Sequence, residues 1–177
     1  MRTLASATFV MLWLVVQATM PAAGGWDPRK SEKVQQTIAA FKKKDPSLKV
    51  FFKKAYGYAV FPSIIKGGMG LGGAYGKGQV FAGGRLIGTA SLAQGSIGFQ
   101  LGGQSYSEII FFQNKSALER FKAGNLKLAA QASAVAVTAG AAKSAAYEKG
   151  VAVFTMTRKG LMYEASIGGQ RFNFKPN

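Results

Sequence analysis

Alternation of apolar and polar residues, punctuated by glycine, dominates this chain from Tyr56 onward. In the segment 95–101, Ile97, Phe99 and Leu101 point one way while the residues between them point the other, as on a β-strand with one buried face. The chain has 23 glycines, and a glycine inside a strand usually marks a bulge, a bend or a close backbone approach. The pattern predicts a strongly curved antiparallel β-sheet or a barrel-like sheet.

Other segments of the same half extend this sheet. Residues 106–112 end in a run that is apolar on both faces, which predicts a central strand. Residues 151–157, a turn at 158–160 and the alternating segment 161–167 predict a hairpin and its return strand, so that the C-terminus is β. Residues 129–146 are rich in alanine, a composition that by itself favours a helix, but Gly140 breaks this stretch. Since Leu126, Leu128 and Ala130 alternate with their neighbours, we expect a strand over 126–137.

Helices are expected before the sheet and once within it. Ser31 is a good N-cap for a helix that ends in a lysine-rich last turn, and Asp45-Pro46 is a second start signal leading into residues 47–55. Ser116 and Glu119 form a capping-box pattern before a third helix. The expected fold class is therefore α+β. The apolar stripes of the first and third helices are Val34, Ile38 and Phe41, and Leu118 and Phe121.

The N-terminus has the pattern of a secretory signal. Arg2 supplies the positive region, residues 8–16 form a short apolar core, and small residues follow at 21–24. We expect a signal peptide over 1–24, a linker over 25–30 and one domain over 31–177. The expected location is outside the cytoplasm, in the periplasm or cell envelope, with peripheral membrane association.

The charge of the chain predicts an anionic partner. Its formal net charge is +16, although charged residues make up only 17% of the sequence. No acidic residue occurs from Pro46 to Ser107, and six lysines fall between Lys42 and Lys54. Lysines beside apolar residues are typical of segments that lie at a membrane interface. The alternative is that these lysines only solvate helices packed on the sheet.

The residue types present argue against catalysis. The chain has no histidine and no cysteine, and its seven carboxylates are scattered or placed at helix starts. The glycine pattern at 68–73 lacks the following helix and the acidic residue that a dinucleotide site needs. We therefore expect no enzyme, no catalytic residue, no cofactor, no metal site and no nucleic-acid partner. The oligomeric state is left open.

Three ordered blocks carry a resemblance to a known family. Residues 55–81 (AYGYAVFPSIIKGGMGLGGAYGKGQVF), 95–112 (GSIGFQLGGQSYSEIIFF) and 159–172 (KGLMYEASIGGQRF) resemble the SYLF family of lipid-binding domains in its bacterial, exported form. The resemblance implies binding of anionic membrane lipids, with phospholipid or phosphoinositide-type head groups, through a basic amphipathic N-terminal region. The residues it implicates are Lys42, Lys43, Lys44, Lys49, Lys53, Lys54 and Lys66, with Phe51 and Phe52 as apolar anchors.

Two other functions fit parts of the pattern. The leader, the size and the glycine and aromatic content also suit a small outer-membrane β-barrel, although the chain does not end on an aromatic residue. A curved sheet could instead carry an apolar ligand in the cell envelope.

Overall fold

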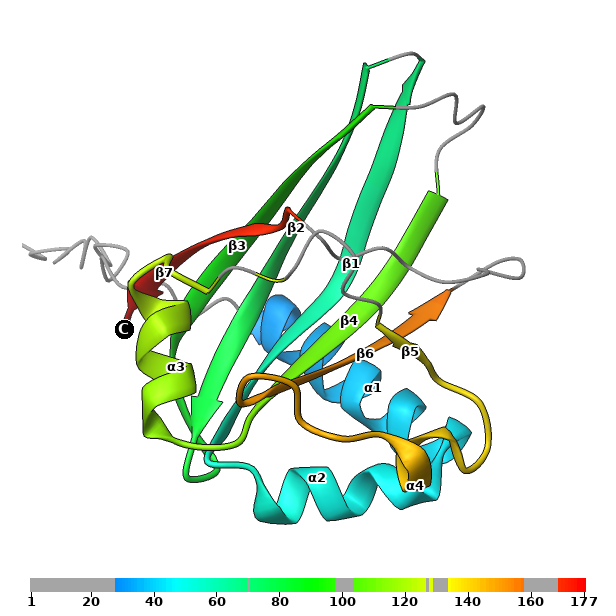
Figure 1. Ribbon diagram of the computed structural model, residues 1–177, viewed down its shortest axis with the longest axis vertical. Coiled ribbons are helices and arrows are strands. Elements are labelled where there is room, and N and C mark those ends of the chain that lie inside the picture. The colour runs from blue at the N-terminus through cyan, green and yellow to red at the C-terminus, as the bar shows by residue number, and fades with distance from the viewer. Residues whose placement is uncertain (1–27, 70, 98–103, 127, 129–133, 158–168) are drawn as a thin grey trace, which may run out of the picture.

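A computed structural model of the chain describes residues 28–69, 71–97, 104–126, 128, 134–157 and 169–177 (Figure 1). The described part combines a long sheet with short helices. In chain order the elements are α1 (Pro28–Lys44), the 3-10 helix η1 (Pro46–Leu48), α2 (Lys49–Lys54), β1 (Gly57–Met69), β2 (Leu71–Ala82), β3 (Arg85–Ile97), β4 (Gln104–Phe112), α3 (Lys115–Lys122), β5 (Val135–Ala136), α4 (Ala141–Ser144), β6 (Val151–Thr157) and β7 (Arg171–Pro176).

The seven strands form one sheet in the order β5-β6-β4-β1-β2-β3-β7. All neighbouring strands are antiparallel except β5, which runs parallel to β6. The α+β class is confirmed, and the described strands form an open sheet with β5 and β7 at its edges. The C-terminal strand β7 is paired with β3, while the expected turn at 158–160 and return strand at 161–167 lie outside the described residues.

Strand β4 shows why the sheet needs a layer on each face. Ile109 and Phe111 belong to one cluster of buried residues, and Ile110 and Phe112 belong to another. Successive side chains of a strand point to opposite faces, so a run of four apolar residues buries both. The prediction of a central strand over 106–112 is confirmed, since β4 lies between β6 and β1.

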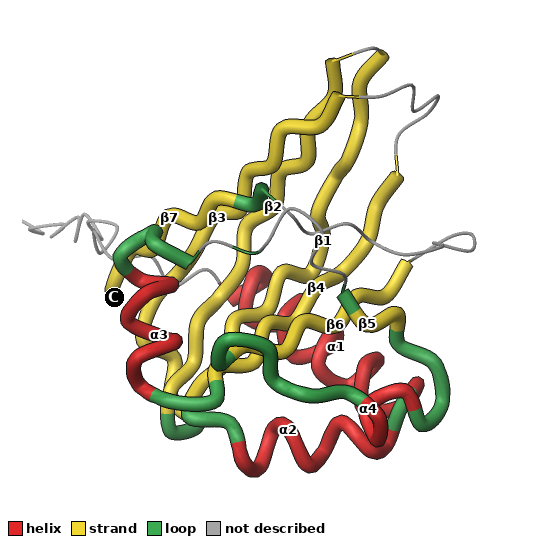
Figure 2. Tube along the Cα trace, in the orientation of Figure 1, coloured by secondary structure: helices red, strands yellow, loops and turns green. Residues whose placement is uncertain are grey.

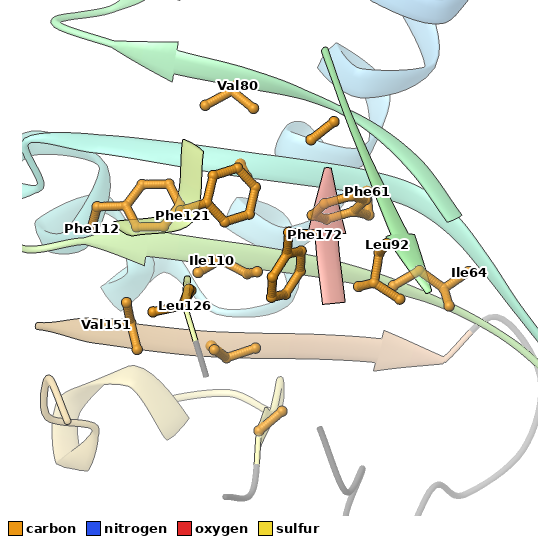
Figure 3. Packing of buried hydrophobic residues seen from close by; sticks show 14 of the residues in the cluster. Phe61, Ile64, Val80, Leu92, Ile110, Phe112, Phe121, Leu126, Val151 and Phe172 are labelled. Atoms are coloured by element: carbon orange, nitrogen blue, oxygen red, sulfur yellow. The ribbon is translucent and has the colours of Figure 1, made fainter. Parts of the chain in front are cut away.

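The cluster that contains Ile110 and Phe112 is covered by α3. Figure 3 shows Phe121 of α3 and Phe172 of the C-terminal strand β7 within this cluster. The ring of Phe121 lies 4.9 Å from Phe112 and 4.9 Å from Phe172, measured between centroids. The cluster that contains Ile109 and Phe111, on the other face, is covered by α1, α2 and α4. Their contributions to that cluster are Val34, Ile38, Phe41, Phe51 and Ala142.

Two helix starts differ from the sequence prediction. Helix α1 begins at Pro28, three residues before the expected boundary, although its predicted apolar stripe is buried. Helix α3 is capped by Asn114, whose Oδ1 accepts a hydrogen bond from the Ala117 N–H at 3.0 Å. The expected capping box is therefore wrong. Glu119 lies in the middle of the helix and forms an ion pair with Lys122 at 3.0 Å.

The expected strand over 126–137 is wrong for most of its described residues. Only Val135–Ala136 is a strand, while Leu126 is buried without belonging to one. Gly140 interrupts this region as predicted, with a φ of 81° in the left-handed region that favours glycine.

Asp45 joins the N-terminal helices to α4. Its side chain is 1% exposed, and Oδ1 accepts hydrogen bonds from the backbone N–H and the hydroxyl of Ser47. Oδ2 accepts the N–H of Ala142 at 2.7 Å, across 97 residues of sequence. Burial by itself raises the pKa of Asp45, but these hydrogen bonds lower it below its ordinary value of 3.8. One ionised carboxylate therefore caps two helices.

Replacing Asp45 by Ala should cost about 2–3 kcal/mol of unfolding free energy, because both caps are lost and the Ala142 N–H stays buried without an acceptor. Urea unfolding at pH 7 measures this cost. The exposed Glu32→Ala is the control and should change stability by less than about 0.5 kcal/mol. The native contribution should also fade as pH falls below 3.8 through the lower folded pKa. Equal stability of the two variants would contradict the role of Asp45.

Gly78 permits a close approach of β2 to β1. A Cβ at this position would lie 2.8 Å from Cδ1 of Phe61 and in contact with the carbonyl oxygen of Val60. The register of β1 with β2 shifts between Val60 and Ser63, so the approach occurs where the strand bulges. A side chain has no room there.

Gly78→Ala should therefore destabilise the protein by about 1–3 kcal/mol, the usual cost of overpacking. Thermal unfolding followed by circular dichroism is the measurement. Gly95→Ala serves as the matched control because a Cβ there meets nothing within 4 Å. A Gly78→Ala variant as stable as Gly95→Ala would show that the strands separate without cost.

Candidate functional site

The six clustered lysines lie on the outer side of α1 and α2. Phe41, Leu48 and Phe51 of the same segment are buried against the sheet, so the residues between them face away from it. Lys43, Lys44, Lys49, Lys53 and Lys54 are exposed. Lys42 is half-buried, with Nζ 4.4 Å from the ring centroid of Phe52. We call these six residues the lysine surface.

No ion pair among the described residues neutralises the lysine surface. The ion pair found there within 4.0 Å joins Lys122 to Glu119 on α3. Asp45, the acidic residue between α1 and α2, is buried and committed to backbone amides. The positions of Lys42–Lys44 and Lys53–Lys54 at helix C-termini are favourable for the helices themselves. Their charges remain available to an external anion.

The two predicted apolar anchors are not free side chains. Phe51 is only 8% exposed, and its ring packs on Phe154 and Phe111 with centroids 4.9 and 5.4 Å apart. Phe52 is half-buried, 4.8 Å from Phe111. We therefore correct the assignment of Phe51, because its place at i+3 from Leu48 directs it toward the sheet. Both rings hold α2 on the sheet.

Val50 is the apolar residue that α2 presents to solvent. Its side chain is 52% exposed, and Lys53 and Lys54 follow it at helical spacing. The exposure of Val50 could have been predicted from the sequence, since a residue three or four positions before two lysines lies on the same helix face as they do. The sequence prediction instead took the larger phenylalanines as the apolar anchors.

Lys66 is not part of the lysine surface. It lies near the far end of β1, about 30 Å along the strand from Gly57. Its register partners are Ala74 and Gln104, and the buried Ala74 belongs to the cluster under α3, on the other sheet face. The structure thus separates this lysine from the other six.

Arg85 joins the basic end of the molecule instead. The turn at Gly83 and Gly84 returns β3 to the end of the sheet where β1 begins, since Ala82 pairs with both Gly57 and Arg85. The exposed Arg85 lines an open groove together with Ala55 and Tyr56, which directly follow α2. Sequence reasoning missed this residue because its proximity to α2 depends on the strand register.

A buried carboxyl group lies on the opposite face of the sheet. Glu108 on β4 is 0% exposed, and its Oε2 accepts a hydrogen bond from Nε2 of Gln170 at 3.1 Å. Burial raises the pKa of Glu108 to about 7, and the hydrogen bond from Gln170 opposes this rise. Burial and the charge of Glu108 also raise the pKa of the Tyr106 phenol above its ordinary value of 10. Among the described residues, Oε1 of Glu108 has no hydrogen-bond partner.

Stability should therefore decrease as pH rises between 4.5 and about 7. In this window the unfolded state releases the Glu108 proton while the folded state retains it, at a cost of up to about 3 kcal/mol. Urea unfolding at several pH values should show this slope in the wild type and in the exposed control Glu148→Gln, but not in Glu108→Gln. A slope that persists in Glu108→Gln would assign it to another group.

The acidic residues of the described part of the chain form no group of three or more that could hold a metal ion. None of its helices combines the length and the apolar character that crossing a membrane requires.

Comparison with known proteins identifies relatives of this chain. Residues 93–177 match the family described as Ysc84, Las17-binding protein actin regulator. The chain is also similar to beta cell expansion factor A of Aeromonas veronii, with 32% identity over 136 residues that cover 72% of this chain and 49% of the relative. The chain spans about half the length of that relative. The family match includes β4, β6 and β7 but not the lysine surface. The three sequence blocks predicted a SYLF domain. The family match and this relative show that the chain belongs to the Ysc84 family of SYLF domains.

Proposed function

We propose that the protein binds anionic membrane lipids peripherally, without catalysing a reaction, through the lysine surface together with Arg85 and Val50. One observation carries this proposal: α1 and α2 bury Phe41 and Phe51 against the sheet and leave six lysines on their outer side, none of them within 4.0 Å of a carboxylate of the described residues. Membership of the SYLF family is consistent with lipid binding.

The charge sets the expected strength of binding. Each lysine near an anionic surface contributes about 1 kcal/mol, so six lysines contribute about 6 kcal/mol. That free energy corresponds to a dissociation constant of about tens of micromolar. Since the interaction is electrostatic, it should be reversible and should weaken as salt is added.

The proposed location follows from the leader-like residues 1–24, which lie outside the described residues. An exported bacterial protein meets phosphatidylglycerol and cardiolipin rather than phosphoinositides. We therefore propose phospholipid head groups in the periplasm or cell envelope as the natural anions. The lysine surface contacts their phosphates while Val50 reaches the interface.

Charge reversal at Lys53 and Lys54 should separate this proposal from simple solvation of the helices. Lys53→Glu/Lys54→Glu should lower affinity for vesicles of equal phosphatidylcholine and phosphatidylglycerol by at least about tenfold, because two attractions become repulsions. The control Lys33→Glu/Lys115→Glu changes the same charge at exposed positions outside the lysine surface. It should change affinity much less.

Co-sedimentation measures binding, and circular dichroism melts verify that both variants fold. Equal losses in the two variants would mean that only net charge matters. Equal binding of the wild type to pure phosphatidylcholine vesicles would reject the proposal.

A further inference from the structure

The long hairpin of β1 and β2 carries two exposed apolar side chains beyond the helices. Ile65 is 65% exposed and Tyr75 is 52% exposed. They are direct register partners, so their side chains lie next to each other on one face of the sheet. Figures 1 and 2 show β1, β2 and β3 extending well past α1 and α2. Exposed apolar side chains gathered in this way usually mark a contact surface.

A bulge in β1 decides which face these residues occupy. The register with β2 shifts between Val60 and Ser63, so that Val60 pairs with Gln79 and Ile65 pairs with Tyr75. Tyr75 and Gln79 are separated by an even number of positions on β2 and share a face. Val60 contacts the cluster under α1. Ile65 and Tyr75 therefore lie on the helix-bearing side of the sheet, where the lysine surface also lies.

Cations accompany this apolar pair. The row of register partners Ile65, Tyr75, Ala93 and Arg171 crosses four strands, and the next row contains Lys77. Lys77 and Arg171 are exposed. Strands β1, β2, β3 and β7 contain no aspartate or glutamate. The patch thus combines apolar contact with positive charge and has no acidic residue to oppose an anion. We call Ile65, Tyr75, Lys77 and Arg171 the distal sheet patch.

The charge argues against a second copy as the partner. Two copies meeting through this patch would bring the same cations together, and each chain has a formal net charge of +16. An anionic bilayer offers phosphates to Lys77 and Arg171 and an apolar boundary to Ile65. Tyrosine is enriched at that boundary because its ring is apolar and its hydroxyl is polar.

We propose that the distal sheet patch is a second lipid contact, in which Ile65 and Tyr75 enter the interface of an anionic bilayer while Lys77 and Arg171 bind phosphates. This inference rests on the proposed function and adds an apolar contact distant from the helices. Binding should then keep a component that salt does not remove, because apolar burial is not screened.

The absence of cysteine makes a direct test possible. Ile65→Cys, labelled with an environment-sensitive fluorophore, should shift to shorter wavelength on vesicles of equal phosphatidylcholine and phosphatidylglycerol and be quenched by brominated acyl chains. Ala123→Cys is the control, since Ala123 is exposed at the end of α3 on the opposite sheet face. Its label should not respond.

A second variant measures the energetic contribution. Ile65→Ser/Tyr75→Ser should lower vesicle affinity about tenfold and remove the salt-resistant component, while Lys53→Glu/Lys54→Glu removes the salt-sensitive one. Because Ile65 and Tyr75 are exposed, both variants should fold, which a thermal melt verifies.

Each result has a separate meaning. An unresponsive label at position 65 with the wild type still bound to vesicles would overturn this inference and leave the proposed function intact. Failure of the wild type to bind anionic vesicles would reject the proposed function itself. A response to heparin as large as that to vesicles would indicate a general polyanion site, and a response to protein concentration alone would indicate self-association. Either of these would overturn the lipid assignment.

Discussion

The carboxylate of Asp45 is the interaction on which the arrangement of the basic region depends. It caps η1 through Ser47 and holds the N-terminus of α4 through Ala142. Because this acid is buried, the turn beside Lys44 exposes no negative charge. The same contact therefore fixes the helices and preserves the positive character of their outer side. A surface carboxylate at this turn would have neutralised part of the lysine surface.

The sheet has a buried core on each face, and the two proposed lipid contacts lie on the same one of these two sides. On one face, α3 and Phe172 cover a continuous core that also encloses the buried Glu108. On the other face, α1 and α2 cover only part of the strands, and Ile65 and Tyr75 lie beyond them. Both proposed lipid contacts are on this second side. The two contacts differ in physical character, since one depends on charge and the other also buries apolar surface.

Local signals predicted much of the fold. Asp45-Pro46 predicted a helix start, residues 106–112 predicted a central strand, and Gly140 predicted a break in the alanine-rich segment. Each of these features is determined by residues close together in the sequence. Ser116 failed as a cap because Asn114, two residues earlier, offered an acceptor to the same turn. The strand expected over 126–137 failed because alanine-rich alternation does not specify a partner strand.

The candidate site was less predictable than the fold. Five of the six clustered lysines are exposed, but Phe51, which the family resemblance offered as a membrane anchor, is buried by the sheet. Arg85 and Tyr75 depend on strand register, and the burial of Glu108 depends on Gln170 from a distant part of the chain. A local sequence pattern cannot predict contacts between residues that are far apart in the chain.

The central claim is that the lysine surface brings the protein to an anionic bilayer. Its most direct test is the binding of the full chain to phosphatidylcholine vesicles with and without phosphatidylglycerol, measured over a range of salt concentrations. The account predicts binding that requires phosphatidylglycerol and weakens strongly as salt is added. The small amount of binding that remains at high salt comes from the apolar contact of the distal sheet patch. Binding that is equal on both vesicles, or absent from both at low salt, would contradict it.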